Sequence, residues 1–199
     1  MNITQNLRRA VLMTVVTTIL LGIVYPLAVT GAAQLLFHEK ANGQLIERNG
    51  RLIGSRIIGQ AFAGPGYFHG RPSAAGTGYD AANSAGTNLG PTNKKLLDAV
   101  TAAVAAAKQQ NPCAEPCPSV PVDLVTTSAS GLDPHLSPAA AAFQVSRVAR
   151  ERGRAENEIR ALVAAYTEGR QLGFLGEPRV NVLMLNLALD DRYSSRSLR

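Results

Sequence analysis

One long apolar stretch near the N-terminus carries no charged side chain. It comprises residues 10–37, AVLMTVVTTILLGIVYPLAVTGAAQLLF, 28 positions in all. A helix needs about 20 such residues to cross a hydrocarbon core of about 30 Å, so this stretch is long enough to span a membrane. Pro26 lacks a backbone N–H group, and we expect the helix to bend there.

A cleaved signal peptide is the competing interpretation of the same stretch. Arg8 and Arg9 precede it, and Gly31-Ala32-Ala33 resembles a small-residue cleavage site. The apolar region of a signal peptide is, however, only about 7 to 15 residues long. Here 16 residues separate Arg9 from Pro26, and apolar residues continue to Phe37. We therefore favour an uncleaved anchor.

The orientation of this anchor does not follow from a simple count of charges. The cations beyond its far end outnumber Arg8 and Arg9, and they are Lys40, Arg48, Arg51 and Arg56. Long domains, however, cross membranes largely regardless of their charge, and Arg8 and Arg9 lie close to the helix beside the amino terminus. We expect residues 1–9 to be a cytoplasmic tail, 10–37 a transmembrane helix and 38–199 an exterior domain.

Small side chains recur at every fourth position along one part of the anchor. Thr14, Thr18 and Gly22 share a helix face and would permit close approach of another helix. The pattern predicts a helix interface within the membrane, although Thr and Gly are also common in membrane helices that have no partner.

The remaining chain alternates between helix and strand patterns, which indicates an α+β fold with a single mixed domain. In QLIERNGRLIGSRI, Asn49-Gly50 suits a type I′ turn between two short strands. Thr92 or Asn93 can cap a helix that continues to Gln110. Its expected apolar side consists of Leu97, Val100 and Val104.

The second half of the domain is predicted to be mostly helical. Ser137-Pro138 begins a helix that should run to Arg152 and stop at Gly153. A further helix is expected from Ala155 to Thr167, with a buried side formed by Ile159, Leu162, Val163 and Tyr166. DLVTTSASG suggests a short strand and a turn. RVNVLMLNLALD suits a strand, a helix, or a strand that turns into a helix.

The charge of the chain does not indicate a nucleic-acid partner. The net charge is +6 and the pI is about 9.7, but acids are interleaved with the bases. Between Arg147 and Arg170 there are six arginines and four glutamates, which at helical spacing form a paired, solvated face.

Residues 67–93, YFHGRPSAAGTGYDAANSAGTNLGPTN, contain five glycines and neither valine nor isoleucine. Such a composition is typical of a flexible linker. The stretch nevertheless contains aromatic residues, an Arg-Pro pair and a Gly-Pro turn, and loops of this length are often functional. Physical reasoning alone leaves both interpretations open.

Candidate chemistry outside this stretch is sparse. Cys113 and Cys117, in a proline-rich loop, would form a local disulfide outside the cytoplasm, and zinc would need further ligands that the distant histidines hardly supply. Ser130, Asp133 and His135 invite comparison with a hydrolase triad, but no Gly-x-Ser-x-Gly motif occurs. A turn before the Ser137 cap is the simpler interpretation of Asp133-Pro134.

No nucleotide-binding glycine motif is present, and the anchor contains no acid or base for an ion relay. We therefore expect neither a bound cofactor nor a metal, and no catalytic residues of the chain's own.

Several long motifs in order along the chain carry a family resemblance. They are YFHGRPSA, YDAANSAGTNLGPTN, TTSASGLDPHLSP, QVSRVARERG and GEPRVNVLMLNLALD. With the N-terminal spanning helix, they resemble the C subunit of the Kdp potassium-transporting ATPase, over nearly the whole chain. NPCAEPCP, residues 111–118, departs from the family's motifs and puts a redox role in doubt.

The resemblance implies an accessory subunit of a bacterial inner-membrane complex, with its soluble domain in the periplasm. Its implied partners are a channel-like potassium-translocating subunit, a P-type ATPase subunit and a small single-span subunit. It also implies a catalytic chaperone that raises the ATP affinity of the ATPase subunit through a ternary complex. A periplasmic domain would exert such an effect through a shared conformational equilibrium, without contacting the nucleotide.

On this interpretation the glycine-rich stretch is an ordered surface for docking a partner. Aromatic and arginine side chains anchor interfaces, and asparagines offer donors and acceptors. The candidate contact residues are Tyr67, Phe68, Arg71, Asn83, Asn88 and Asn93. The alternative from another class is a free-standing anchored envelope protein, either a hydrolase using Ser130 and His135 or a ligand-binding module.

Overall fold

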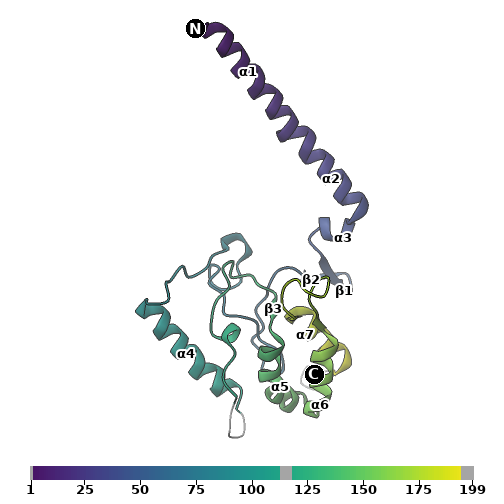
Figure 1. The fold of residues 1–199 in the computed structure, drawn as a ribbon. Coiled ribbons are helices and arrows are strands. Elements are labelled where there is room, and N and C mark those ends of the chain that lie inside the picture. Colours follow the sequence, from purple (N-terminus) through teal and green to yellow (C-terminus); the bar gives the residue numbers. More distant parts are fainter. Residues whose placement is uncertain (1, 113–117, 194–199) are drawn as a thin grey trace. The chain divides into compact units, whose positions relative to one another are not determined.

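The computed structural model describes residues 2–112 and 118–193 (Figure 1). The chain divides into two compact units, residues 1–53 and 54–199, which are described separately. The first contains the apolar anchor and most of a hairpin, and the second is a mixed α+β domain, as predicted.

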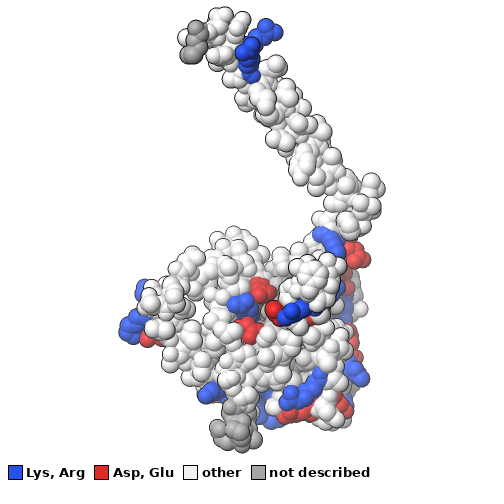
Figure 2. Space-filling model, in the orientation of Figure 1, with Lys and Arg blue, Asp and Glu red and all other residues white. Residues whose placement is uncertain are grey.

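The anchor is a continuous helical stretch from Ile3 to Leu36. It consists of α1 (Ile3–Ile19), a π-helical turn η1 (Leu20–Val24) and α2 (Tyr25–Leu36). The stretch has 34 residues, and its most apolar window of 18 residues has a mean hydropathy of 2.2 and no buried residue. Its only charged side chains lie close to the N-terminal end (Figure 2). A helix long and apolar enough to cross a membrane is thereby confirmed, and it begins earlier than expected.

The π-helical turn has a local cause in Pro26. Proline cannot donate to the carbonyl of Gly22, four residues earlier, and its ring crowds that oxygen. The turn Leu20–Val24 immediately precedes the α2 turn that contains Pro26. The helix thus accommodates the proline by a change of hydrogen-bonding pattern and remains continuous.

The anchor ends in a small polar cluster. Phe37 leaves the helical conformation with φ −139°, and a short helix α3 (His38–Ala41) follows. The side-chain amides of Gln34 and Asn42 exchange two hydrogen bonds of 3.2 Å. The Lys40 ammonium lies 5.8 Å from the centre of the Phe37 ring. Aromatic and cationic side chains of this kind suit the boundary between lipid and water.

Two short strands, β1 (Leu45–Arg48) and β2 (Arg51–Ser55), form the expected hairpin. Both residues of its turn have positive φ, 54° at Asn49 and 72° at Gly50. A type I′ turn requires this combination, so the prediction from Asn49-Gly50 is confirmed.

The core of the domain lies between three helices and a small antiparallel sheet. The helices are α5 (Pro138–Arg152), α6 (Glu156–Ala165) and α7 (Val182–Arg192). The sheet has the order β3 (His135–Leu136), β5 (Arg179–Asn181), β4 (Thr167–Glu168). The core's large, fully buried apolar side chains are Phe68, Val145, Val148, Ile159, Val180, Leu185 and Leu189.

Side-chain caps and one glycine set the helix boundaries, largely as predicted. Ser137 Oγ accepts a hydrogen bond from Ala140 N at 3.1 Å, and Gly153 ends α5 with φ 61°. RVNVLMLNLALD is a strand that turns into a helix. The change occurs at Asn181, which pairs with His135 in the sheet and caps α7 by accepting from Met184 N at 3.1 Å.

Helix α4 (Lys94–Gln110) lies at the edge of the domain (Figure 1). Asn93, one of the two predicted caps, accepts a hydrogen bond from Lys95 N at 2.9 Å. Ala107 is the buried residue of this helix. Of its expected apolar side, Val100 and Val104 are half-buried and Leu97 is exposed. The helix therefore packs on the domain mainly through its C-terminal half.

Two expectations about local structure are wrong. DLVTTSASG, residues 123–131, contains no strand. It starts within a 3-10 turn, η3 (Val122–Leu124), because the Asp123 carboxylate accepts a hydrogen bond from Ser137 N at 2.7 Å. Helix α6 ends at Ala165, before Thr167, which instead joins the sheet opposite Val180. Tyr166 is consequently exposed, whereas Ile159, Leu162 and Val163 are buried as predicted.

Candidate functional site

The beginning of the glycine-rich stretch is held inside the domain by two side-chain amides. Asn186 on α7 accepts from Phe68 N and donates to Phe68 O, both at 2.9 Å. Gln144 on α5 accepts from His69 N at 2.8 Å and donates to His69 O at 3.0 Å. Each amide supplies the two hydrogen bonds that a neighbouring strand would supply. An extended segment is thereby fixed between two helices, with its polar backbone satisfied.

A buried arginine, Arg147, supports the same segment from α5. Its side chain is only 3% exposed. It donates to Tyr67 O at 2.8 Å, to Asn111 Oδ1 at 2.9 Å, to Gln144 Oε1 at 2.7 Å and also to Pro65 O. Burial lowers the pKa of Arg147 to about 10. These acceptors are neutral oxygens, so their hydrogen bonds, together with the favourable charge of Glu151, stabilise the guanidinium. Arg147 thereby links α5 to Asn111 and to the segment that contains Pro65 and Tyr67.

Tyr67 lies at the junction of α5 and α7. Its hydroxyl donates to Asp190 Oδ2 at 3.0 Å, and the Arg152 guanidinium lies 4.6 Å from the centre of its ring. Arg152 also binds Asp190 Oδ1 at 2.9 Å. Burial raises the pKa of Tyr67, and the hydrogen bond and charge of Asp190 raise it further. The tyrosine is thus part of an internal polar cluster.

Arg71 fixes the next part of the stretch to the segment that precedes β3. It donates to Asp133 Oδ2 and to Thr127 O, both at 3.1 Å. The backbone oxygen of Arg71 accepts from the Tyr79 hydroxyl at 2.5 Å. Burial opposes ionisation of Asp133, but hydrogen bonds from His135 and Arg71 outweigh it and lower the pKa. The carboxylate therefore remains charged and paired at neutral pH.

The following residues lie directly on the SASG segment, residues 128–131. Ser73 Oγ donates to Gly131 O at 2.6 Å, and Ala85 N donates to Ser130 O at 3.1 Å. Gly131 has φ +69°, and a Cβ atom there would lie 2.7 Å from Ala75 N and Ala85 O. Only glycine permits this approach. The glycine-rich stretch is therefore an ordered loop and not a flexible linker.

The six predicted docking residues fall into three groups by exposure. Phe68 has no exposed surface, so its assignment as a contact residue is wrong: it is a core side chain. Tyr67 and Arg71 are half-buried and bonded within the domain. Asn83, Asn88 and Asn93 are exposed. We name residues 81–93 the exposed arc, since only Gly86 and Leu89 within it are half-buried.

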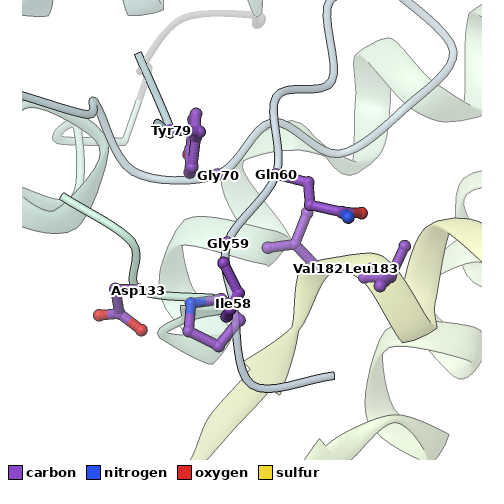
Figure 3. Close-up of a pocket in the computed structure, with 9 residues that line it drawn as sticks. Ile58, Gly59, Gln60, Gly70, Tyr79, Asp133, Val182 and Leu183 are labelled. Atoms are coloured by element: carbon purple, nitrogen blue, oxygen red, sulfur yellow. The ribbon is translucent and has the colours of Figure 1, made fainter. Parts of the chain in front are cut away.

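Figure 3 shows a depression where Gly59, Tyr79 and Asp133 approach the beginning of α7. Gly59 N donates to Leu132 O at 2.8 Å, and a Cβ atom on Gly59 would lie 2.7 Å from Asp133 O. The space available to a water-sized molecule is about 0 Å³. Close packing of these chain segments fills this region, so it offers no room for a ligand.

Ser130 and His135 are not arranged as a hydrolase pair. Ser130 Oγ accepts from Leu132 N at 3.1 Å, and His135 Nδ1 lies 3.5 Å from Asp133 Oδ1. Asp133 is engaged by Arg71. Among the hydrogen bonds of the described residues, none joins Ser130 to His135. Both residues hold the loop and the turn before β3, and the hydrolase alternative loses its geometric basis.

Two further predictions remain open. Within residues 2–112 and 118–193, no group of three or more His, Cys, Asp or Glu side chains could hold a metal ion. Cys113 and Cys117 lie outside the described residues. In the anchor, Thr18 Cγ2 lies 4.0 Å from where a Cβ atom on Gly22 would be, so these residues share a face. That this face, which also includes Thr14, contacts another helix stays a prediction.

The residues that hold the loop were missed by sequence reasoning. Gln144, Arg147 and Asn186 each interrupt a run of small or apolar residues on a helix. A polar side chain at a position that the helical period assigns to the core requires a buried partner. That signal was available in FQVSRVAR and LMLNLALD, although it does not reveal which backbone groups are bound.

The fold and these contacts define an α+β domain that displays an ordered glycine-rich loop and follows a helix long and apolar enough to cross a membrane. Residues 7–191 match the family model described as KdpC: K+-transporting ATPase, c chain. The chain belongs to this family.

Three of the relatives named Potassium-transporting ATPase KdpC subunit show the extent of the match. That of Koribacter versatilis is 67% identical over 186 residues, covering 94% of each chain. That of Rhodospirillum rubrum is 58% identical over 189 residues, covering 95% of this chain and 97% of the relative. That of Myxococcus xanthus is 57% identical over 180 residues, covering 90% of this chain and 84% of the relative. The resemblance found in the motifs is thereby confirmed.

Proposed function

We propose that this chain is a non-catalytic accessory subunit of a potassium-transporting ATPase and stabilises the assembly of its larger subunits. The match to the c-chain family over residues 7–191 carries this proposal. A single helix able to cross a membrane gives such a subunit its place beside membrane-embedded partners. Those partners are a channel-like potassium-translocating subunit, a P-type ATPase subunit and a small single-span subunit of a bacterial inner membrane.

The N-terminus lies in the cytoplasm and the domain in the periplasm under this proposal. Arg8 and Arg9 at the N-terminal end of the anchor support this orientation. Protease added to spheroplasts distinguishes the alternatives. Removal of the domain with the anchor left in the membrane is expected, and full protection of the domain would contradict the orientation.

The exposed arc is the part of the glycine-rich loop that docks on a partner. Its backbone is held in place: Asp80 accepts from Ala82 N at 3.0 Å, and Ser84 Oγ donates to Ser130 O at 2.9 Å. A preformed loop loses less conformational entropy on binding than a flexible one. The exposed amide of Asn88 supplies donors and an acceptor for the partner, and Asn83, whose Nδ2 donates to Asp80 Oδ2 at 2.6 Å, supplies its amide oxygen.

Such docking also explains how this subunit raises the ATP affinity of its partner without contacting ATP. If the domain binds one conformation of the ATPase assembly better than another, it shifts the shared equilibrium, and ATP affinity changes with it. Coupling between two sites is typically about 1 to 3 kcal/mol, or roughly 5- to 150-fold in affinity. Any ternary complex with ATP and the ATPase subunit then forms through the partner.

Purification of the tagged chain in mild detergent tests the proposal. We expect a larger ATPase and a channel-like protein to accompany it, with potassium-stimulated ATP hydrolysis that is lost when the gene for this chain is deleted. A tagged chain truncated after Leu36 serves as the control for binding through the anchor alone. Recovery of the full chain by itself, with hydrolysis unaffected by the deletion, would exclude the accessory role.

A further inference from the structure

An exposed apolar loop between β4 and β5 has no role in the functions discussed so far. We name residues 171–175, QLGFL, the apolar tip. Leu172 is 83% exposed, Phe174 69% and Leu175 48%. Together they form one of the most exposed apolar clusters of the domain. Scattered single apolar residues on a surface are ordinary, but three within four positions indicate an interaction site.

The apolar tip is held in a defined conformation. Gln171 and Leu175 exchange two backbone hydrogen bonds of 2.9 Å, and Arg170 binds Glu177 at 2.8 Å below them. Leu172 has φ 53°, a left-handed conformation that is costly for a leucine. The adjacent Gly173 has φ 84°. The turn thus keeps its apolar side chains outward although water disfavours that arrangement.

Arginines surround the base of the tip. Arg56 and Arg179 both bind Glu168 on β4, at 2.8 and 3.1 Å, and Arg170 binds Glu177. Three arginines against two glutamates leave a surplus of one positive charge. Apolar side chains that project beyond a group of arginines suit the lipid–water interface, where acyl chains meet anionic headgroups.

We propose that the apolar tip inserts into the headgroup region of the bilayer in which the anchor is embedded. The chain contains its own helix able to span a membrane, so the domain stays beside a bilayer surface. A second, weak contact with that surface becomes effectively intramolecular and needs little affinity of its own. Its effect is to restrict the rotation of the domain, and this proposal holds independently of whether the exposed arc docks on another subunit.

The absence of tryptophan from the sequence allows a clean fluorescence test. Phe174→Tryptophan (F174W) places a single reporter on the tip, and V122W places one on η3, where Val122 is also 69% exposed. Each full-length variant is reconstituted into vesicles of phosphatidylethanolamine and phosphatidylglycerol with brominated acyl chains. Either orientation of the anchor leaves the domain at a bilayer surface, so mixed insertion does not affect the result.

We expect the F174W emission to shift to shorter wavelength and to lose intensity in brominated vesicles relative to unbrominated ones. The V122W emission should show neither change. Equal behaviour of the two reporters would overturn the proposal. Replacing Leu172 and Leu175 by serine in the F174W chain should abolish the quenching.

The assembled complex provides a second measurement. A photoreactive benzoylphenylalanine at position 174 is expected to yield lipid adducts in native membranes, identified by mass spectrometry. An adduct with another protein chain would show that a partner subunit covers the tip, and no adduct would show that the tip faces water. Both of these results overturn the membrane proposal, and neither affects the test of assembly by co-purification.

Discussion

Asn186 and Phe68 are 118 residues apart in the sequence, yet the side-chain amide of one binds both backbone groups of the other at 2.9 Å. Gln144 repeats the arrangement one residue further along, at His69. The YFHG motif, residues 67–70, therefore takes its position from contacts with α5 and α7. These contacts make the glycine-rich loop part of the core and let it present the exposed arc in one conformation.

Loss of the Asn186 amide should destabilise the domain. Asn186→Ala leaves the buried N–H and C=O of Phe68 without partners, and each unsatisfied group costs about 1 to 3 kcal/mol. We expect the free energy of unfolding to fall by about 2 to 5 kcal/mol, measured by urea denaturation of the detergent-solubilised chain with circular dichroism.

Asn157→Ala on the exposed surface of α6 is the matched control. It removes the same side chain without exposing a buried backbone pair: Asn157 Oδ1 accepts a 2.9 Å hydrogen bond from the exposed Glu158 N, so the loss should be about 0.5 to 1 kcal/mol. Equal effects of the two substitutions would show that the hydrogen bonds of the Asn186 amide do not contribute to the stability of the domain.

The close approach of the loop to Gly131 can be separated from the cost of its backbone conformation. Gly131→Ala and Gly153→Ala both place a Cβ atom at positive φ, +69° and +61°. That conformation costs about 1 to 2 kcal/mol for a residue other than glycine. Only at Gly131 would the Cβ atom also collide with backbone atoms, at 2.7 Å, because nothing lies within 4 Å at Gly153.

Gly131→Ala should therefore destabilise the domain more than Gly153→Ala does. It should also displace residues 73–86 from the SASG segment and expose them to limited proteolysis. If the two variants have the same unfolding free energy and the same proteolytic pattern, the loop does not depend on this contact.

The Arg71–Asp133 pair should make stability depend on pH in the acid range. The pKa of Asp133 is lowered in the folded state from an ordinary value of 3.8. The unfolded chain therefore binds the proton more readily, so the contribution of this carboxylate is fully present above its unfolded pKa. It is lost as pH falls below about 3.8 and through the lower folded pKa.

We expect Asp133→Asn to lower the unfolding free energy most at neutral pH, and the difference from the native chain to shrink as the solution is acidified toward pH 3. Asp98→Asn, on the exposed surface of α4, is the control. A difference that stays constant with pH would mean that the charge of Asp133 does not contribute.

Local rules identified most elements of this protein because the relevant signals lie within a few residues. Asn49-Gly50 requires a primed turn, Ser137-Pro138 begins a helix, and the uncharged stretch before Glu39 is long and apolar enough to span a membrane. The end of α6 was misplaced because Thr167 pairs with Val180 in the sheet, and no local sequence pattern reveals that pairing.

The contact residues of the glycine-rich loop were harder to assign for the same reason. Aromatic residues suit both a core and an interface, and their sequence neighbourhood does not distinguish the two. Phe68 belongs to the core because Asn186 and Gln144 bring the loop inside. Asn83 and Asn88 of the exposed arc stay at the surface because the SASG segment supports the backbone below them.

Side chains of the exposed arc should affect assembly of the complex without affecting the stability of the domain. Asn88 has φ 53° and is exposed, so Asn88→Gly removes its amide while keeping a backbone conformation that glycine adopts freely. We expect less of the larger subunits to accompany the tagged variant, with its unfolding free energy unchanged. Asn157→Ala is again the control, now for a surface amide outside the arc. Normal recovery with Asn88→Gly, and also with Asn83→Ala, would mean that the amides of Asn83 and Asn88 do not carry the docking.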